Sequence, residues 1–245
     1  MSSNAAHHSD LSLPKHPHLK GAPVNIDLAL PYLKALERKD GHTAAHVWRV
    51  TLYTRLLCEE ADVDHEAINR ISMAAALHDI GKLDVPDEIL LKPGKLTDEE
   101  FNIIKQHPHT GHQRLLALDI DDQVALSLVR WHHERVDGLG YPDGLKDEQI
   151  PLGPRFFAVI DSFDALTSLR PYRADVGPEA AERALEELHR SIGTRYCAEA
   201  VEAFDRLFRQ DKLTWILNYF NDACAVPDLA HMHTAAPSNP HHARP

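Results

Sequence analysis

The spacing of apolar residues is the feature that most constrains the fold of this chain. In "VWRVTLYTRLLCEEA" and "HEAINRISMAAALHDI", apolar residues recur close to the period of one face of an α-helix. They are Val47, Val50, Leu52, Leu56 and Leu57 in the first segment and Ile68, Ile71, Ala75 and Leu77 in the second. No alternating run is long enough for a substantial sheet, and no internal repeat is present. The pattern therefore predicts an all-α fold.

Local signals divide the chain into helices and one long loop. Thr97 and Glu100 have the spacing of a capping box and predict a helix start. Pro108 lacks an amide proton and is expected to kink or restart that helix. The glycines and prolines of "RVDGLGYPDGLKDEQIPLG" predict an ordered surface loop or lid. Further helices are predicted over "DQVALSLVRWHHE", "PRFFAVIDSFDALTSL", "GPEAAERALEELHRSI" and "AEAVEAFDRLFRQDKLTWILNYFN".

Composition limits the class of protein. The chain has 245 residues, 43% of them hydrophobic, enough for a sizeable core. No run approaches the roughly 18 apolar residues of a membrane span, and the N-terminus lacks a signal-peptide core. Cys58, Cys197 and Cys224 have no metal-type spacing, so we expect a reduced, cytoplasmic protein without disulfides. A formal net charge of −11 argues against a protein that coats duplex nucleic acid.

The ends of the chain differ from its middle. Segments rich in Ser, Pro and Ala predict flexible tails at 1–24 and 226–245, around one domain at 25–225. The chain has 18 histidines, of which ten lie between residues 42 and 189. The other eight lie in the tails and are expected to be solvated: His7, His8, His16, His18, His231, His233, His241 and His242.

The central histidines and several aspartates form a candidate metal site. His42 and His46 are four residues apart, as are His78 and Lys82, so each pair shares a helix face. The other members are Asp79, His107, His132, His133, Asp161 and Asp164. Imidazole and carboxylate ligands suit iron, manganese or zinc. Taken singly, each has a simpler explanation, such as a helix that stops at Gly81 in "LHDIGK". Together they favour a metal site.

Five motifs follow one another in a recognisable order: "HVWRV", "LHDIGKLDVPDEILLKPGKLT", "KQHPHTG", "WHHERVDGLGYPDGL" and "IPLGPRFFAVIDSFDALTSLRPYR". From about residue 40 to 206 the chain resembles the HD-GYP family of bacterial signalling phosphodiesterases. The resemblance implies an HD-domain helical bundle with a GYP loop and a buried site for two or three divalent metal ions, iron first and manganese as the alternative. The ligands it implies are His46, His78, Asp79, His107, His132, His133 and Asp161.

The resemblance also implies a substrate, cyclic di-GMP, cut to linear pGpG and in some members onward to GMP. Asp79 would bridge two metals, and Lys82 would stabilise charge on the phosphoryl oxygens. Asp164 would either orient a ligand or assist proton transfer. Tyr141 of "GYP", with Arg170 and Arg173 of "RPYR", matches positions that hold phosphate or guanine.

Three departures from the family pattern leave alternatives open. His42 stands where three-metal members carry a glutamate, so it is an additional potential ligand. Residues 193–198 read "GTRYCA" in place of "GTHFDP", where we expect a local packing change. No receiver domain precedes the motifs, so we expect a stand-alone module controlled by a partner. The alternatives are a hydrolase of another cyclic dinucleotide or nucleotide, and a catalytically weak binding protein that senses cyclic di-GMP or docks other signalling proteins through residues 136–152.

No membrane or nucleic-acid polymer is expected as a partner, and the sequence specifies no oligomeric state.

Overall fold

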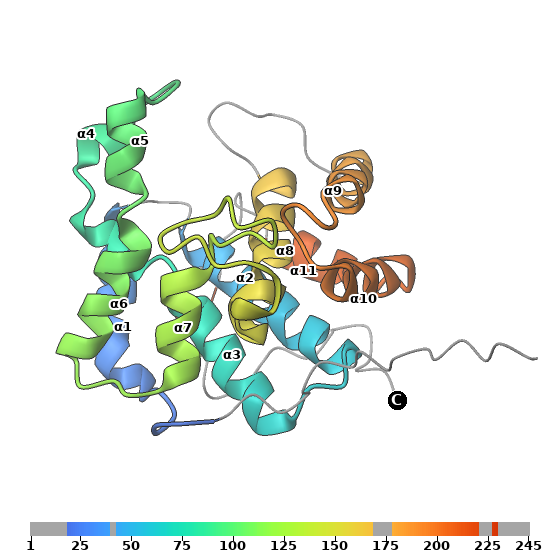
Figure 1. Ribbon diagram of the computed structural model, residues 1–245, viewed down its shortest axis with the longest axis horizontal. Helices are drawn as coiled ribbons and strands as arrows, with labels where there is room; N and C mark the ends of the chain where they lie inside the picture. Colours follow the sequence, from blue (N-terminus) through green and yellow to red (C-terminus); the bar gives the residue numbers. More distant parts are fainter. Residues whose placement is uncertain (1–18, 40–42, 169–177, 221–226, 230–245) are drawn as a thin grey trace, which may run out of the picture.

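Figure 1 shows the computed structural model, which describes residues 19–39, 43–168, 178–220 and 227–229. The α-helices are α1 (Ile26–Lys39), α2 (Thr43–Glu60), α3 (His65–Leu77), α4 (Asp87–Leu90), α5 (Asp98–Ile104), α6 (His107–Ala117), α7 (Gln123–Trp131), α8 (Leu152–Thr167), α9 (Pro178–Arg190), α10 (Ala198–Arg209) and α11 (Thr214–Tyr219). Two short 3-10 helices are η1 (Ile80–Asp84) and η2 (Asp147–Gln149). Within these residues no strand forms beyond the isolated bridges Asp137–Lys146 and Ile192–Tyr196. The predicted all-α fold is confirmed.

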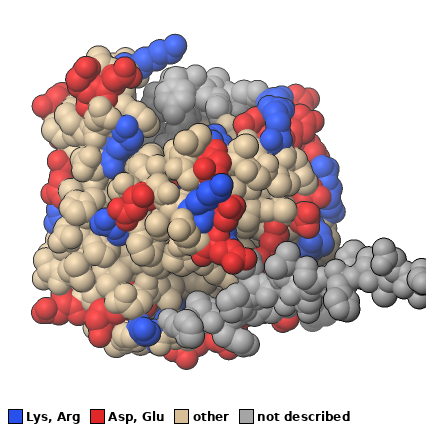
Figure 2. All heavy atoms as spheres, in the orientation of Figure 1, with Lys and Arg blue, Asp and Glu red and all other residues tan. Residues whose placement is uncertain are grey.

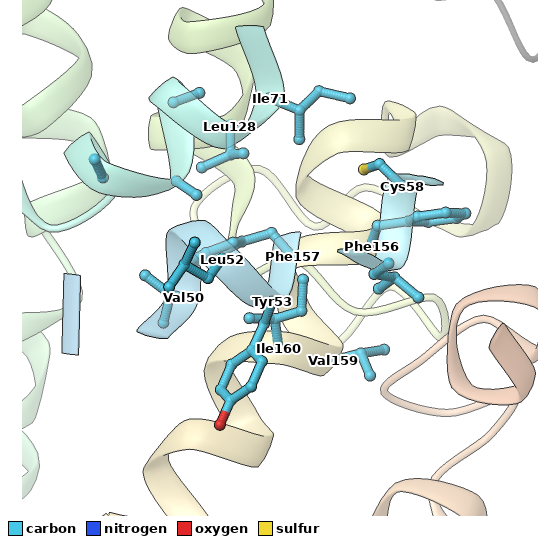
Figure 3. Close-up of a cluster of buried hydrophobic side chains, with 14 of the residues drawn as sticks. Val50, Leu52, Tyr53, Cys58, Ile71, Leu128, Phe156, Phe157, Val159 and Ile160 are labelled. Carbon is cyan, nitrogen blue, oxygen red and sulfur yellow. The ribbon is translucent and has the colours of Figure 1, made fainter. Parts of the chain in front are cut away.

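A single apolar core holds the helices together. Helices α2, α3, α7 and α8 form the centre, with α1 and α6 on one side and α9 and α10 on the other (Figure 1). Tyr53, Ile71, Leu128, Phe157 and Ile160, drawn in Figure 3, are fully buried between them. Burial of a large apolar side chain contributes about 1.5–3 kcal/mol. The apolar periodicity of α2 and α3 therefore faces this core.

Phe157 of α8 connects the core to a polar centre. Its ring centroid lies 4.8 Å from that of His78 and 6.2 Å from that of His132. All three side chains are buried, and close-packed neighbours restrict the rotation of a ring. The core thus helps to orient two of the predicted ligands.

Two predicted helix boundaries are confirmed. The Thr97 hydroxyl accepts a hydrogen bond from the Glu100 amide at 3.2 Å, and the Thr97 amide donates to the Glu100 carboxylate at 2.8 Å. This capping box begins α5. Pro108 is the second residue of α6, where a missing amide proton leaves no helical bond unmade, so the chain restarts there.

The single helix predicted over "AEAVEAFDRLFRQDKLTWILNYFN" is wrong, because the structure has two helices. Helix α10 ends at Arg209 and α11 begins at Thr214. Between them Asp211 adopts a left-handed backbone with φ of 56°. The resulting turn brings Leu213 into the core, where it is 1% exposed.

Parts of both predicted tails pack on the domain. The Lys20 carbonyl accepts a hydrogen bond from the Gln123 amide, and the Gly21 carbonyl accepts one from Arg70 at 2.8 Å. At the other end, the Trp48 indole donates to the Pro227 carbonyl at 2.8 Å. Lys20, Gly21 and Pro227, within the predicted tails, therefore contact the domain. Residues 1–18, 226 and 230–245 lie outside the described residues.

The surface carries charges of both signs. On the face in Figure 2, acidic and basic side chains are interspersed, with uncharged residues between them. Among the described residues, no helix combines the length and apolar character needed to cross a bilayer.

Gly81 has a different role from the helix stop considered above. Helix α3 already ends at Leu77, and Gly81 lies inside η1 without a left-handed backbone. A Cβ atom at Gly81 would lie 2.0 Å from the His107 carbonyl oxygen and 2.6 Å from the Gly111 amide nitrogen. The absence of a side chain therefore lets η1 press against the backbone of α6, next to two predicted ligands.

We predict that Gly81→Ala lowers the free energy of unfolding by about 3 kcal/mol, because the added methyl group meets rigid backbone. Gly153→Ala is the matched control. A Cβ there would lie 3.7 Å from Ile71, an ordinary contact, and alanine favours a helix, so stability should stay equal or rise by up to about 1 kcal/mol. Denaturant unfolding measures both. Equal unfolding midpoints for Gly81→Ala and the wild type would contradict this account.

Candidate metal centre

The predicted ligands come together from separate helices. His46 lies on α2, His78 and Asp79 directly follow α3, His107 begins α6, and Asp161 lies on α8. His132 and His133 directly follow α7. Two groups have ligand atoms that all lie within 4.8 Å of one another: His46, His78 and Asp79 form one, and His107, His132 and His133 form the other.

Asp79 lies between the two groups. Its Oδ2 is 3.1 Å from Nε2 of His78, and its Oδ1 is 3.3 Å from Nε2 of His107. One carboxylate thus presents an oxygen to each group, as a ligand shared by two ions would. Asp161 is farther away, with its Oδ1 at 4.0 Å from Nε2 of His78.

The backbone determines which ring nitrogen faces the centre. The Nδ1 atoms of His78, His107 and His132 lie 2.8, 2.8 and 3.0 Å from the carbonyl oxygens of the residues three positions earlier, Ala75, Ile104 and Val129. A carbonyl oxygen only accepts hydrogen bonds, so each Nδ1 carries the proton. In the neutral ring, Nε2 is then left with a lone pair directed inward.

These lone pairs face one another at short range. Nε2 of His107 lies 3.0 Å from Nε2 of His132, and Nε2 of His46 lies 3.3 Å from Nε2 of His78. Without a proton between them such pairs repel, and a cation between them removes the repulsion. The donor set therefore fits divalent metal ions that accept imidazole and carboxylate ligands.

Burial determines the charge of the second group, which consists of His107, His132 and His133. It lowers the pKa of His107 to about 3 and that of His133 to about 4, and it brings the pKa of His132 well below its usual value. All three imidazoles are thus neutral at physiological pH, the form that binds a metal.

The first group is more strongly influenced by Asp79. Burial lowers the pKa of His78, but the neighbouring Asp79 outweighs it, and the pKa lies above its usual value. Burial likewise raises the pKa of Asp79, yet His78 and Lys82 bring it well below normal. Asp79 is therefore ionised and attracts positive charge to the place where a metal ion would lie.

Asp164 lies behind His46. It is fully buried and accepts a hydrogen bond from Nδ1 of His46 at 2.7 Å. Arg49 donates to both of its oxygens, and Ser168 donates from its hydroxyl at 3.0 Å. Asp164 does not line the cavity described below. Asp164 thus contacts His46 from the side away from the cavity.

Lys82 and Tyr141 lie beside the ligands. Nζ of Lys82 is 2.6 Å from Oδ2 of Asp79. The Tyr141 ring packs on that of His133, with centroids 4.9 Å apart. His42, Arg170 and Arg173, the remaining predicted site residues, lie outside the described residues.

Glu134 anchors the predicted loop. Its carboxylate is 3% exposed and accepts hydrogen bonds from the amides of Asp143, Gly144 and Leu145 at 2.7–3.1 Å. Arg130 adds a bidentate ion pair to Asp143. The loop is therefore ordered, as predicted, and holds Tyr141 at the centre.

A cavity of about 510 Å³ opens beside the ligands. Its wall includes His132, His133 and Asp161 from the centre. The other lining residues are Phe101, Lys105, Glu134, Arg135, Leu139, Gly140, Tyr141, Ala158, Ser162, Ala165, Arg195 and Tyr196.

Sequence reasoning assigned no role to several residues of this region. Arg49 stands three residues after His46 in "HVWRV", so helical spacing was an available signal. Glu134 directly follows the two histidines of "WHHE". Arg195, in the segment expected to change only packing, lies on the cavity wall.

Comparisons with known proteins agree with this architecture. A family model described as an HD domain matches residues 28–199. The cyclic di-GMP phosphodiesterase response regulator RpfG of Xanthomonas campestris is 41% identical over 197 residues, covering 80% of this chain and 51% of that protein. The 3'3'-cGAMP-specific phosphodiesterase 2 of Vibrio cholerae is 36% identical over 183 residues, covering 72% of this chain and 33% of that protein. This chain thus spans about half, or less, of the length of these relatives.

A solved structure has the same fold. The cyclic GMP-AMP-specific phosphodiesterase V-cGAP3 of Vibrio cholerae superimposes with a TM-score of 0.59 at 16% identity, covering 86% of this chain and 53% of that chain. The family model spans most of the described helices, and the histidine and GYP motifs meet at one centre. The chain therefore belongs to the HD domain family and, within it, to the HD-GYP proteins.

Proposed function

We propose that this chain is a metal-dependent phosphodiesterase that hydrolyses cyclic di-GMP to pGpG, with either pGpG or GMP as the end product. The observation that carries the proposal is the pair of ligand groups joined by Asp79, at the edge of a cavity of about 510 Å³. A relative that is 41% identical is named a cyclic di-GMP phosphodiesterase. A cytoplasmic location is part of the same proposal.

The proposed ligands divide between two ions. His46, His78 and Asp161 would hold one, His107, His132 and His133 the other, and Asp79 both. We propose iron first and manganese as the alternative. A third ion depends on His42. When bound, such ions polarise a phosphodiester and activate water for attack on phosphorus.

The chain's own residues would bind and orient the substrate. The Lys82 ammonium, beside Asp79, would contribute a positive charge near the phosphoryl oxygens. Tyr141 would present its ring or hydroxyl to the nucleotide. We propose that Arg170 and Arg173 hold phosphate or guanine, as their positions in "RPYR" imply. We also propose that other signalling proteins dock on residues 136–152 of the GYP loop.

A second candidate substrate is 3'3'-cGAMP. The relative from Vibrio cholerae that is 36% identical is named for that substrate. A metal centre contacts the phosphodiester, which both cyclic dinucleotides contain, so the predicted ligands serve either reaction.

We predict that anaerobically metal-loaded protein converts cyclic di-GMP to pGpG or GMP, and that a chelator abolishes the conversion, since the ligands need cations to act. Chromatography of products alongside metal analysis measures this. A faster reaction with 3'3'-cGAMP in direct competition would support the second candidate. Tight binding of cyclic di-GMP without product, with either iron or manganese, would contradict the enzyme and support a sensor.

His78→Ala and Asp79→Ala should each lower turnover by at least about 100-fold and reduce the bound metal, because loss of a ligand exceeds the 10–100-fold effect typical of residues behind the ligands. His65→Ala is the control, because His65 is exposed at the start of α3, the helix that ends just before His78, and it should retain both metal and turnover. Metal analysis and initial rates measure the change. If both variants keep their metal and activity, the proposed ligand set is wrong.

We propose that Asp164 positions His46, and predict two effects of Asp164→Asn. Arg49 would remain buried without its carboxylate, which costs about 3–5 kcal/mol of stability. Metal affinity should also fall by about 10–100-fold. Asp205→Asn, which removes a partly exposed ion pair with Arg209, should cost less than about 1 kcal/mol. Thermal unfolding and metal titration measure both, and unchanged metal affinity would contradict the positioning role.

A further inference from the structure

The cavity beside the predicted metal ligands is lined by three basic residues. Lys105 follows α5, Arg135 begins the GYP loop, and Arg195 lies in the turn between α9 and α10. The chain has a net charge of −11, so three basic residues lining one cavity are more than its acidic composition would lead one to expect. A cation on the cavity wall can bind an anion only if no carboxylate of the protein already neutralises it.

Only one of the three is neutralised within the described residues. Arg135 forms a two-point ion pair with Asp137. Among the described residues, no carboxylate oxygen lies within 4.0 Å of the Lys105 ammonium or the Arg195 guanidinium. Nζ of Lys105 lies 5.2 Å from the centre of the Phe101 ring, which leaves its charge unpaired. Both cations are thus available to an anion in the cavity.

The backbone beneath Arg195 is firmly held. The Ser191 carbonyl accepts hydrogen bonds from the amides of Thr194, Arg195 and Tyr196 at 2.9–3.3 Å. The Asp137 amide donates to the Thr194 carbonyl at 2.9 Å, which ties this turn to the GYP loop. Arg195 is therefore attached to a fixed backbone and lines the same cavity as Tyr141 and Asp161.

We propose that Lys105 and Arg195 bind the second phosphodiester of a cyclic dinucleotide while the first lies at the metal centre. This inference rests on the proposed function. A cyclic dinucleotide carries two negative phosphodiesters, and the metal ions neutralise only the one being cut. The other needs cations, since an unpaired charge in a cavity is costly. Arginine binds phosphate through two parallel hydrogen bonds, and lysine acts as a point charge.

The assignment also explains the departure at residues 193–198. The sequence there has Arg195 and Tyr196 in "GTRYCA". Tyr196 is buried and hydrogen-bonds to Ser162, so it packs the turn against α8. Arg195 is exposed to the cavity and is not needed for that packing. The arginine thus adds a binding contact while its neighbour maintains the structure.

The test compares two substrates on the metal-loaded protein. Cyclic di-GMP has two phosphodiesters, whereas bis(4-nitrophenyl) phosphate has one. We expect Arg195→Gln and Lys105→Gln each to raise the KM for cyclic di-GMP by about 10-fold or more, the usual size of a charge-assisted hydrogen bond. The loss of kcat/KM should be several-fold larger for cyclic di-GMP than for bis(4-nitrophenyl) phosphate. Arg195→Lys should give an intermediate KM.

Arg190→Gln is the matched control, because Arg190 is exposed on α9 and pairs with Glu187 away from the cavity. It should leave both substrates unaffected. Equal losses on both substrates, or no loss on either, would overturn the assignment.

Failure of the proposed function can be separated from failure of this inference. If the wild type binds but does not cut cyclic di-GMP, the proposed activity is wrong. Calorimetry with cyclic di-GMP then tests the subsite directly: weaker binding by Arg195→Gln and Lys105→Gln supports it, and unchanged binding overturns it. If the wild type does not bind cyclic di-GMP, both proposals are wrong.

Discussion

Imidazole rings that face one another across a buried centre repel unless a positive charge lies between them. In this protein the Nε2 atoms of two histidine pairs approach to 3.0 and 3.3 Å. The Nδ1 protons of three of these rings are committed to backbone carbonyls, so their inward lone pairs stay free. Burial also opposes protonation of the second group. A bound cation removes the repulsion, and the charge of Asp79 favours it further.

The contact from a histidine ring to the carbonyl three residues earlier recurs at His78, His107 and His132. Each is found where a helix ends or begins, because inside a helix that carbonyl is occupied by the helical hydrogen-bond ladder. The centre therefore needs several helix termini at one point. The apolar core brings them there, and the close approach of Gly81 to α6 sets their separation. Ligand geometry in this protein is thus largely a property of the backbone.

The difference between local helix signals and contacts of distant residues explains which features were predicted well from the sequence. The periodicity of α2 and α3 and the capping box at Thr97 depend on residues close together in the chain. A short stretch of sequence is therefore enough to predict them. The ligand set was predicted through the resemblance, because residues so far apart in the chain carry no local signal of proximity. Spacing alone left His78 and Asp79 as a plausible helix end.

The features that escaped prediction depend on tertiary contacts. Arg49 and Asp164 are 115 residues apart, and neither has a pattern that points to the other. Glu134 accepts hydrogen bonds from backbone amides. Almost every residue has such an amide, so no residue type in the sequence identifies the partners of Glu134. The break at Asp211 requires a left-handed backbone, which aspartate adopts more often than most residues but at only a small fraction of its positions, so the sequence alone does not locate it.

In the proposed phosphodiesterase, the choice of substrate depends on residues outside the metal centre. A metal centre contacts one phosphodiester, and that group is identical in every cyclic dinucleotide. Discrimination among bases, and between one phosphodiester and two, must come from residues that do not bind metal. In this chain those residues line the cavity from α5, the GYP loop and the turn before α10. Glu134 and the Ser191 carbonyl hold the loop and the turn in place before any ligand arrives, which lowers the entropic cost of binding. In the proposed phosphodiesterase, changes such as Arg195 would therefore alter selectivity while the proposed metal ligands and their backbone supports stay the same.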